Sequence, residues 1–206
     1  MASLLQSLNA ELSGAIASAR NSVVQVRDRW SGAGAGTIWH PDGLIVTNAH
    51  VARRGPFEVV LSNGHVFPAH LIARDEMRDL AALAVQAHNL PTIQPGNVRA
   101  LQPGQWVFAI GHPWGIANAA TGGIIIGFGS HLPERPAGRQ DWIVVDLHLR
   151  PGNSGGPLVD TAGQLIGVNT MITGPNVGIA VSVETVKLFL RQSLNAVLAA
   201  DSAAAV

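Results

Sequence analysis

Gly-Asn-Ser-Gly-Gly-Pro at residues 152–157 places one hydroxyl, that of Ser154, inside a glycine-rich turn that side chains cannot crowd. Glycine at position 152 can adopt a strained backbone conformation, so the amides of Gly152 and Ser154 can converge on one point beside the hydroxyl. Two such amides would stabilise an oxyanion, which is half of an acyl-transfer site. The same composition is also typical of an ordinary loop, so the rest of the chain must decide between the two interpretations.

A histidine and an aspartate stand where the other half of such a site would need them. His50 follows the strand-like run at 43–46, and Asp79 precedes the apolar segment at 80–83. A serine hydroxyl needs a base within hydrogen-bond reach, and the imidazole needs an acceptor on its other nitrogen to fix its tautomer. The sequence therefore supplies base, acceptor and nucleophile in the order His50, Asp79, Ser154.

This order of motifs resembles the chymotrypsin-fold serine proteases and, within them, the HtrA/Deg branch. The matching motifs are Thr-Asn-Ala-His, Asp-Leu-Ala and Gly-Asn-Ser-Gly-Gly-Pro-Leu, and the resemblance extends over residues 11–190. It implies a mainly β fold of two six-stranded antiparallel β-barrels with N-terminal and C-terminal helices. It also implies a serine endopeptidase with the catalytic triad His50, Asp79 and Ser154, which hydrolyses peptide bonds of unfolded or damaged proteins through an acyl-enzyme.

The resemblance also assigns the residues around the nucleophile. The oxyanion hole is expected at Gly152, Asn153 and Ser154, with Asn153 mainly shaping the turn. The loop at 112–114 is expected behind the site rather than in it. A collapsed oxyanion hole is an open alternative, because the segments at 130–140, 149–154 and 169–175 contain enough glycine and proline to move.

Substrate-binding residues are inferred from their positions relative to the serine motif. Leu149 and Ile172 match the residues that line the primary pocket in HtrA-like enzymes, and both are apolar, so an aliphatic P1 residue is expected. Thr170, Met171 and Ile172 would offer main-chain groups to an extended peptide. His148 departs from the family pattern: either it turns away from the pocket or it makes the pocket polar and pH-sensitive.

The pattern of apolar residues and turns divides the chain into five parts that would act as one protease unit. The apolar spacing predicts an amphipathic helix in 1–19. Short strands separated by turn signals predict a first barrel at 20–92 and a second at 103–184, joined by a linker at 93–102. A C-terminal helix and tail are expected at 185–206. The candidate triad then spans both barrels, so it can assemble only when they are docked.

Composition excludes several other classes of function. The 206 residues include 13 basic and 13 acidic side chains without a basic run, so binding to nucleic acid or to an anionic membrane surface has no electrostatic support. No apolar stretch approaches the roughly 20 residues of a membrane span. Cysteine is absent, and the histidines do not repeat a metal-ligand spacing, so we expect no metal and no cofactor. Protein or peptide substrates are the expected partners.

The N-terminal segment bears on localisation and assembly. Residues 1–11 lack a basic region and a continuous apolar core, so they do not form a signal peptide. The chain is therefore either cytoplasmic or a periplasmic or secreted protein trimmed of its leader, and the localisation stays open. The resemblance implies a homo-oligomer, a trimer formed through the segment before the first strand, but that helix could equally cover the barrel. No PDZ domain follows, so either this member never had one or it was removed.

Two other functions, a binding module and an α/β-hydrolase, are alternatives to the endopeptidase. A catalytically silent binding or chaperone module on a protease fold is the alternative, because fold does not guarantee activity. The presence of all three triad residues favours the enzyme. An α/β-hydrolase would place its serine before the aspartate and histidine, which is the opposite order.

Overall fold

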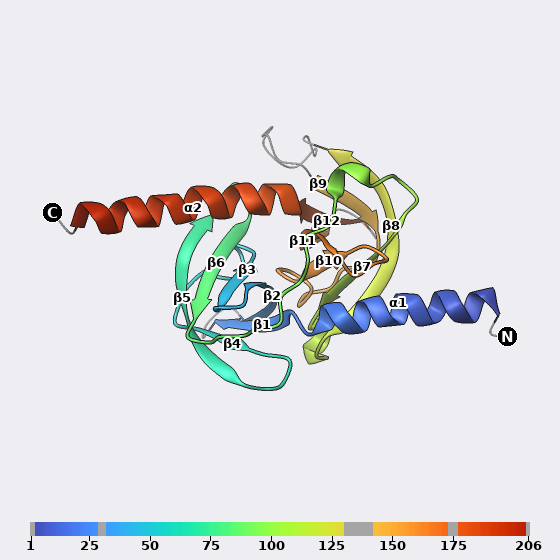
Figure 1. The fold of residues 1–206 in the computed structure, drawn as a ribbon, viewed down its shortest axis with the longest axis horizontal. Helices are drawn as coiled ribbons and strands as arrows, with labels where there is room; N and C mark the ends of the chain where they lie inside the picture. Colours follow the sequence, from blue (N-terminus) through green and yellow to red (C-terminus); the bar gives the residue numbers. More distant parts are fainter. Residues whose placement is uncertain (1–2, 29–31, 130–141, 173–176, 205–206) are drawn as a thin grey trace.

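The computed structural model describes residues 3–28, 32–129, 142–172 and 177–204. Within these ranges the chain forms two closed antiparallel β-barrels of six strands each, flanked by two α-helices (Figure 1). This arrangement confirms the fold class expected from the motif order.

The first barrel closes in the strand order β1-β2-β3-β6-β5-β4. Its interior is filled by β-branched and aliphatic side chains, including Val24, Val26, Ile38, Ile45 and Leu83. Such residues favour strands because they pack well on a pleated surface. Its strands are β1 (Val23–Asp28), β2 (Gly32–His40), β3 (Leu44–Thr47), β4 (Phe57–Val60), β5 (Val66–Asp75) and β6 (Leu80–Val85).

The second barrel closes in the order β10-β11-β12-β9-β8-β7. Its core contains Val107, Ile125, Ile143, Leu158 and Ile166, all of them buried. Two short 3-10 helices, η1 (Val98–Ala100) and η2 (Pro113–Gly115), lie before and after its first strand. Its strands are β7 (Trp106–Gly111), β8 (Ala119–Gly129), β9 (Trp142–Asp146), β10 (Pro157–Val159), β11 (Leu165–Ile172) and β12 (Val177–Ser182).

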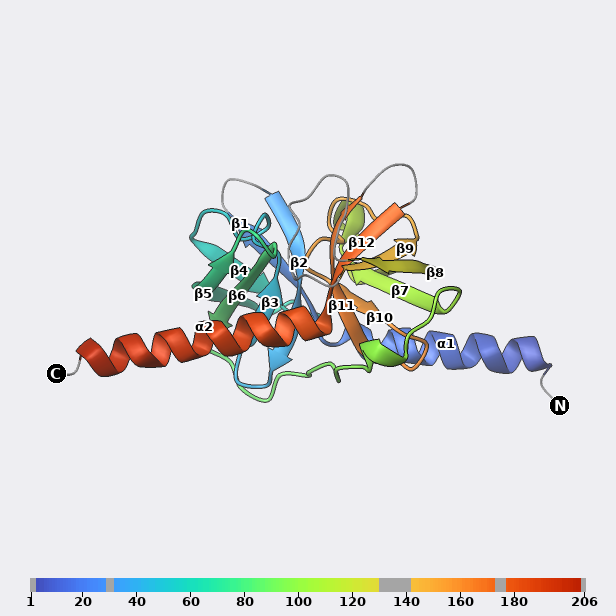
Figure 2. The ribbon, with the colours of Figure 1, turned by 90° about the horizontal axis from the view of Figure 1, so that it is seen from above.

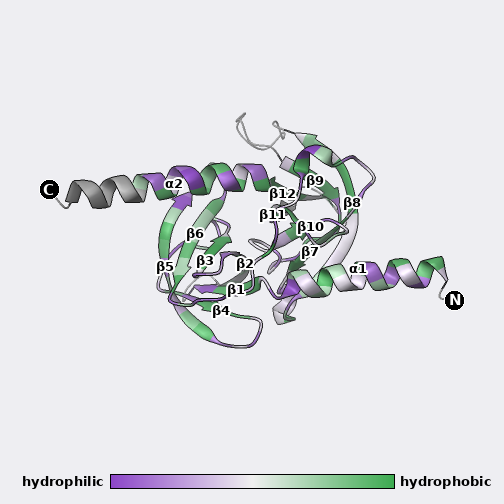
Figure 3. Cartoon of the chain, in the orientation of Figure 1, coloured by the Kyte–Doolittle hydropathy of each residue, from purple (hydrophilic) through white to green (hydrophobic). Residues whose placement is uncertain are grey.

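The N-terminal helix α1 (Leu4–Arg20) begins at a capping box, in which Ser3 and Gln6 satisfy each other's backbone amides. Ala19 near its end is buried beside the second barrel. Its free end projects beyond that barrel (Figures 1 and 2), and there Leu4 and Leu5 are 85% and 75% exposed. In Figure 3 the ribbon is coloured hydrophobic at the tip of this helix.

The C-terminal helix α2 (Val183–Ala204) starts directly after β12 and crosses the first barrel, so the two chain ends lie at opposite ends of the molecule (Figures 1 and 2). Its first turns bury Val186, Phe189 and Leu190 against strands of both barrels. Neither of the helices within the described residues is long and apolar enough to span a membrane.

Two apolar clusters hold the barrels together. One joins Val46 and Leu80 of the first barrel to Trp142 and Val181 of the second, beneath α2. The other joins Ala35 to strands of the second barrel. Since burial of apolar surface stabilises by about 25 cal/mol per Å², this shared core keeps the two barrels docked.

Candidate active site

His50 lies in the turn that follows β3, at the edge of the first barrel that faces the second. Its backbone amide donates to Asp79 Oδ1 at 3.1 Å, and its Nδ1 lies 3.0 Å from Oδ1 and 2.8 Å from Oδ2 of the same carboxylate. Because a carboxylate only accepts, Nδ1 carries the proton and Nε2 is left as the basic nitrogen. The imidazole is 36% exposed, so Nε2 can meet a substrate.

Asp79 is buried, at 4% exposure, just before β6. Its backbone adopts a positive φ of 53°, and its carbonyl accepts a hydrogen bond from Asn48 Nδ2 at 2.9 Å. Its Oδ2 also accepts a short hydrogen bond from the Thr170 hydroxyl. Burial raises the pKa of Asp79, but the hydrogen bonds and charge of His50, with the Thr170 hydroxyl, outweigh it and hold the pKa below the ordinary value.

The Thr170 hydroxyl is a site feature that sequence reasoning missed. We expected only main-chain groups from this residue, yet its side chain reaches from β11 of the second barrel to a carboxylate 91 residues away in the first. No local pattern signals this contact, because it depends on how the barrels dock. This hydrogen bond connects Asp79 in the first barrel to β11 in the second, the strand beside Ser154.

The serine motif begins with a β-turn at residues 150–153. The Asn153 amide donates to the Arg150 carbonyl at 2.9 Å, Pro151 occupies the second position, and Gly152 has φ +102°. Proline followed by a residue of positive φ is the pattern of a type II turn, whereas type I needs negative φ there. The two types differ by a flip of the central peptide, so Gly152 determines the direction of its own amide.

The amides of Gly152 and Ser154 donate no hydrogen bond to any part of the chain that the structure describes. They are therefore available to a developing oxyanion. The Asn153 amide, in contrast, is used inside the turn, and its Oδ1 accepts from the Arg150 amide at 2.9 Å. Of the three residues expected at the oxyanion hole, Asn153 shapes the turn, and its backbone amide is already used there.

Two glycines of the motif are required by close backbone approach. A Cβ at Gly152 would lie 2.5 Å from the His112 carbonyl oxygen, and one at Gly155, whose φ is +83°, would overlap the Ala35 carbonyl of the first barrel. The Ala35 amide in turn donates to the Ser154 carbonyl at 2.8 Å. Main-chain contacts with both barrels thus hold the serine loop in place.

Ser154 and His50 line one pocket, together with Pro151, Gly152 and Val51. The Ser154 hydroxyl donates to the Thr170 carbonyl at 3.1 Å. Across the described residues, no hydrogen bond joins it to His50. The nucleophile and the base therefore line the same pocket, but the hydroxyl must exchange its hydrogen bond to Thr170 for one to the base.

The loop after β7 contacts the serine turn directly. The His112 amide donates to the Gly152 carbonyl at 2.8 Å. Trp114 has a positive φ of 53°, which is strained for a bulky residue, and its ring centre lies 5.2 Å from Arg150 Cζ. This cation–π contact packs Trp114 against Arg150, the first residue of the turn.

His112 itself is buried and neutral. Its Nδ1 accepts from the Asn118 amide at 3.2 Å, while Nε2 is buried without a partner of good hydrogen-bond geometry among the described residues. Burial lowers the pKa of His112, the backbone of Val24 opposes this in part, and the charge of Arg27 adds to the lowering. Protonation of this ring is therefore unfavourable in the folded protein.

The expected substrate residues fall into two groups. Leu149 is buried in the core of the second barrel, and Thr170 is buried at the site. Met171 and Ile172 continue β11, but their side chains lie outside the described residues. His148 is exposed between two buried leucines. Segment 130–140 and part of 169–175 also lie outside the described ranges.

No group of three or more His, Asp or Glu side chains that could hold a metal ion occurs in the described part of the chain. The arrangement around His50 and Ser154 is instead suited to nucleophilic acyl transfer, because it combines a hydroxyl, an oriented imidazole and unpaired backbone amides.

The chain is similar to known proteins in sequence and in fold. The model of the trypsin-like peptidase domain matches residues 34–168. The chain is 40% identical over 162 residues to the putative serine protease HhoB of Synechocystis sp., and 39% identical over 142 residues to the serine endoprotease DegS of Haemophilus influenzae. These alignments cover 76% and 68% of this chain but 39% and 42% of the relatives. The chain thus spans about two fifths of the length of these curated relatives.

A solved structure described as the HtrA-type protease AlgW with decapeptide has the same fold, with a TM-score of 0.82 and 26% identity. The match covers 89% of this chain and 67% of that one. Fold, motif order and sequence similarity all lead to one assignment: the chain belongs to the trypsin-like peptidase family, as an HtrA-type serine protease domain.

Proposed function

We propose that this chain is a serine endopeptidase that hydrolyses peptide bonds of unfolded or damaged proteins through an acyl-enzyme. Ser154 Oγ attacks the scissile carbonyl while His50 Nε2 takes its proton. Asp79 holds the imidazole in the correct tautomer and stabilises the imidazolium that forms. The Gly152 and Ser154 amides stabilise the oxyanion. His50 then protonates the leaving amine, and finally activates the water that hydrolyses the acyl-enzyme.

The observation that carries this proposal is the pocket shared by His50 and Ser154, with the buried Asp79 carboxylate on the other side of the imidazole. The first step requires Oγ to exchange its hydrogen bond to the Thr170 carbonyl for one to Nε2. Hydrogen bonds between nucleophile and base are often long or poorly aligned until substrate binds.

For the substrate, we propose an aliphatic P1 residue and an extended peptide along β11. Leu149 lies in the apolar core of the second barrel, so the barrel beneath a P1 side chain would be aliphatic, and the main chain of Thr170, Met171 and Ile172 continues a strand that can pair with the peptide. The solved structure of AlgW, a protein of the same fold, is described as holding a decapeptide. Profiling with a peptide library tests this preference, and selection of Arg or Lys at P1 would overturn it.

The unit proposed to perform this reaction comprises both barrels and the linker at 93–102, since the three candidate residues come from both barrels.

A homotrimer through the segment before β1 is part of the proposal. The exposed Leu4, Leu5 and Leu8 on α1 supply an apolar surface for it. Light scattering coupled to gel filtration measures the oligomer, and a monomer at all concentrations contradicts this part.

Labelling with a fluorophosphonate tests the proposed chemistry without knowledge of the substrate. Intact mass should show one adduct on the wild-type chain and none on Ser154→Ala, because covalent capture needs an activated serine and an open oxyanion hole. Both proteins are checked for folding by circular dichroism. A folded wild-type chain that forms no adduct contradicts the proposal and favours a catalytically silent binding module.

A further inference from the structure

A second pocket lies next to the candidate site, on the Asp79 side of His50. It is lined by His50, Asp79 and Ala49 and by four charged side chains that the proposed reaction does not use, Arg53, Arg54, Arg74 and Glu76. The first pocket, with Ser154 and Gly152, also includes His50. The imidazole therefore separates the space for the scissile bond from a strongly charged space.

The segment that carries the first two arginines is anchored through its backbone. The Arg54 amide donates to Asp28 Oδ2 at 3.0 Å, and the Arg53 carbonyl accepts from Arg74 Nη1 at 3.5 Å. These contacts position the main chain and leave the side chains of residues 53 and 54 free to extend. The pocket is therefore a feature of the fold and not of one loose loop.

The charges in this pocket do not cancel. Glu76 is paired with Arg74 at 3.2 Å, and Asp79 is hydrogen-bonded to the neutral imidazole of His50, so three arginines face two carboxylates in this lining. Within the residues that the structure describes, the guanidinium groups of Arg53 and Arg54 have neither an ion-pair partner nor a hydrogen-bond acceptor. The pocket thus has an excess of positive charge next to the candidate base.

An extended peptide at the proposed site would direct one particular side chain toward this pocket. Successive side chains of a strand point to opposite faces. If the P1 side chain enters the second barrel at Leu149, the P2 side chain points toward the first barrel, where His50 and the arginine pocket lie. The residue just before P1 is therefore the one that the arginines can contact.

We propose that Arg53 and Arg54 form a subsite that selects an acidic side chain, Asp or Glu, at P2 of the substrate. The inference rests on the proposed endopeptidase function and adds the substrate class. Guanidinium groups bind carboxylates with two parallel hydrogen bonds, which makes arginine suited to this recognition. Because the side chains are exposed, each ion pair contributes little, and we expect an acidic P2 residue to raise kcat/KM about fivefold over its amide counterpart.

The test is cleavage of a peptide library prepared from a denatured proteome, with cleavage sites identified by mass spectrometry. The measured quantity is the ratio of Asp and Glu to Asn and Gln at P2, divided by the same ratio in the library. For the wild-type chain we expect about five, falling toward one when the ionic strength rises from about 0.05 M to about 0.5 M, because salt screens exposed charges.

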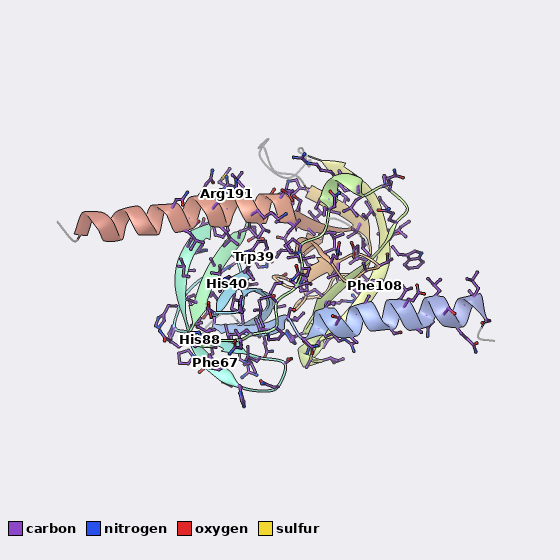
Figure 4. The ribbon with its side chains drawn as sticks, viewed as in Figure 1. Trp39, His40, Phe67, His88, Phe108 and Arg191 are labelled. Atoms are coloured by element: carbon purple, nitrogen blue, oxygen red, sulfur yellow. The ribbon has the colours of Figure 1, made fainter. Side chains whose placement is uncertain are left out.

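The double variant Arg53→Gln with Arg54→Gln should bring this ratio to about one. The matched control is Arg191→Gln, which removes an exposed arginine of α2 (Figure 4) that lines neither pocket, and it should keep the wild-type ratio. Fluorophosphonate titration counts the competent sites in each preparation, so a misfolded variant is recognised.

The outcomes separate the subsite from the function on which it rests. A wild-type ratio of one, or a double variant that keeps the wild-type ratio, overturns the acidic subsite while cleavage itself supports the endopeptidase. A folded wild-type chain that cleaves no peptide and forms no Ser154-dependent adduct overturns the proposed function and the subsite together.

Discussion

The two halves of the candidate site are organised by different physical means. In the first barrel, the acid–base half is built from side chains: His50 and Asp79 are joined by three contacts of 2.8–3.1 Å, and the carboxylate is buried. In the second barrel, the nucleophile half is built from main chain, in a glycine-dependent turn whose Gly152 and Ser154 amides are unpaired among the described residues.

Because of this difference, we expect the two halves to be sensitive to different kinds of substitution. The acid–base half depends on charge and hydrogen bonding, so it should respond to changes of side-chain chemistry that preserve shape. The nucleophile half depends on backbone dihedral angles, so it should respond to a single added carbon. Thr170 connects the halves, since its hydroxyl contacts Asp79 and its carbonyl accepts from Ser154.

The largest effect should come from Asp79→Asn, which keeps the shape but removes the charge. We expect kcat to fall about 10⁴-fold, because the amide favours the wrong imidazole tautomer. Steady-state kinetics on a cleaved peptide measures this. Asp42→Asn, at an exposed aspartate of the same barrel, is the matched control and should retain activity. Near-normal turnover of Asp79→Asn would remove this residue from the triad.

Gly152→Ala should have the next largest effect, on the backbone half. The added carbon would meet the His112 carbonyl at 2.5 Å in a residue with φ +102°, so the turn must shift and one oxyanion donor is lost. Loss of one donor costs about 100- to 1000-fold in kcat.

The control is Gly64→Ala, which has φ +86° but no atom within 4 Å of the added carbon. It imposes similar strain far from the site and should lower stability without lowering kcat. Equal activity of the two variants in the same assay would show that the turn geometry does not matter.

Thr170→Val tests the connection between the halves and should have a smaller effect. Loss of the hydroxyl removes one hydrogen bond to the Asp79 carboxylate, and such bonds to charged groups contribute about 1.5–3 kcal/mol. We expect kcat/KM to fall about tenfold. Thr170→Ser keeps the hydroxyl and should restore most of the activity. If valine and serine behave alike, the side-chain hydrogen bond has no role.

The smallest effect concerns stability at mildly acidic pH. The pKa of His112 is lowered in the folded state, so the unfolded chain binds more protons near the ordinary value of 6.5. The contribution of His112 to the free energy of unfolding is therefore fully present above pH 6.5. It is lost as the pH falls through the lower pKa of the folded state. Asp79 does not act in this window, because its pKa is lowered from 3.8 and its contribution is lost only below that pH.

Urea unfolding between pH 7.5 and 5.5 measures this loss. His112→Gln can still accept a hydrogen bond from the Asn118 amide but does not titrate, so its unfolding free energy should vary less with pH. A wild-type chain and a His112→Gln variant with parallel pH dependence would contradict the assignment.

Much of this protein follows from local patterns along the chain. The glycine-rich turn around Ser154, the histidine after a strand and the aspartate before another identify the candidate residues, because acyl transfer needs those groups in those roles. The N-terminal helix also follows from a local signal, the three- and four-residue spacing of its apolar side chains. The 112–114 loop was predicted to lie behind the site, and its direct hydrogen bond to the Gly152 carbonyl could not be predicted because it has no local signature.

The motifs and their order along the chain are enough to predict the family, the candidate nucleophile, base and aspartate, and the need for glycine at position 152. The packing of the barrels establishes that the Ser154 hydroxyl donates to the Thr170 carbonyl, and that the Gly152 and Ser154 amides and the two arginines beside the base have no partner among the described residues. The physical reason is that residue type and dihedral preference are local properties. Hydrogen-bond partners and local charge depend instead on how two barrels, far apart in the chain, are packed together.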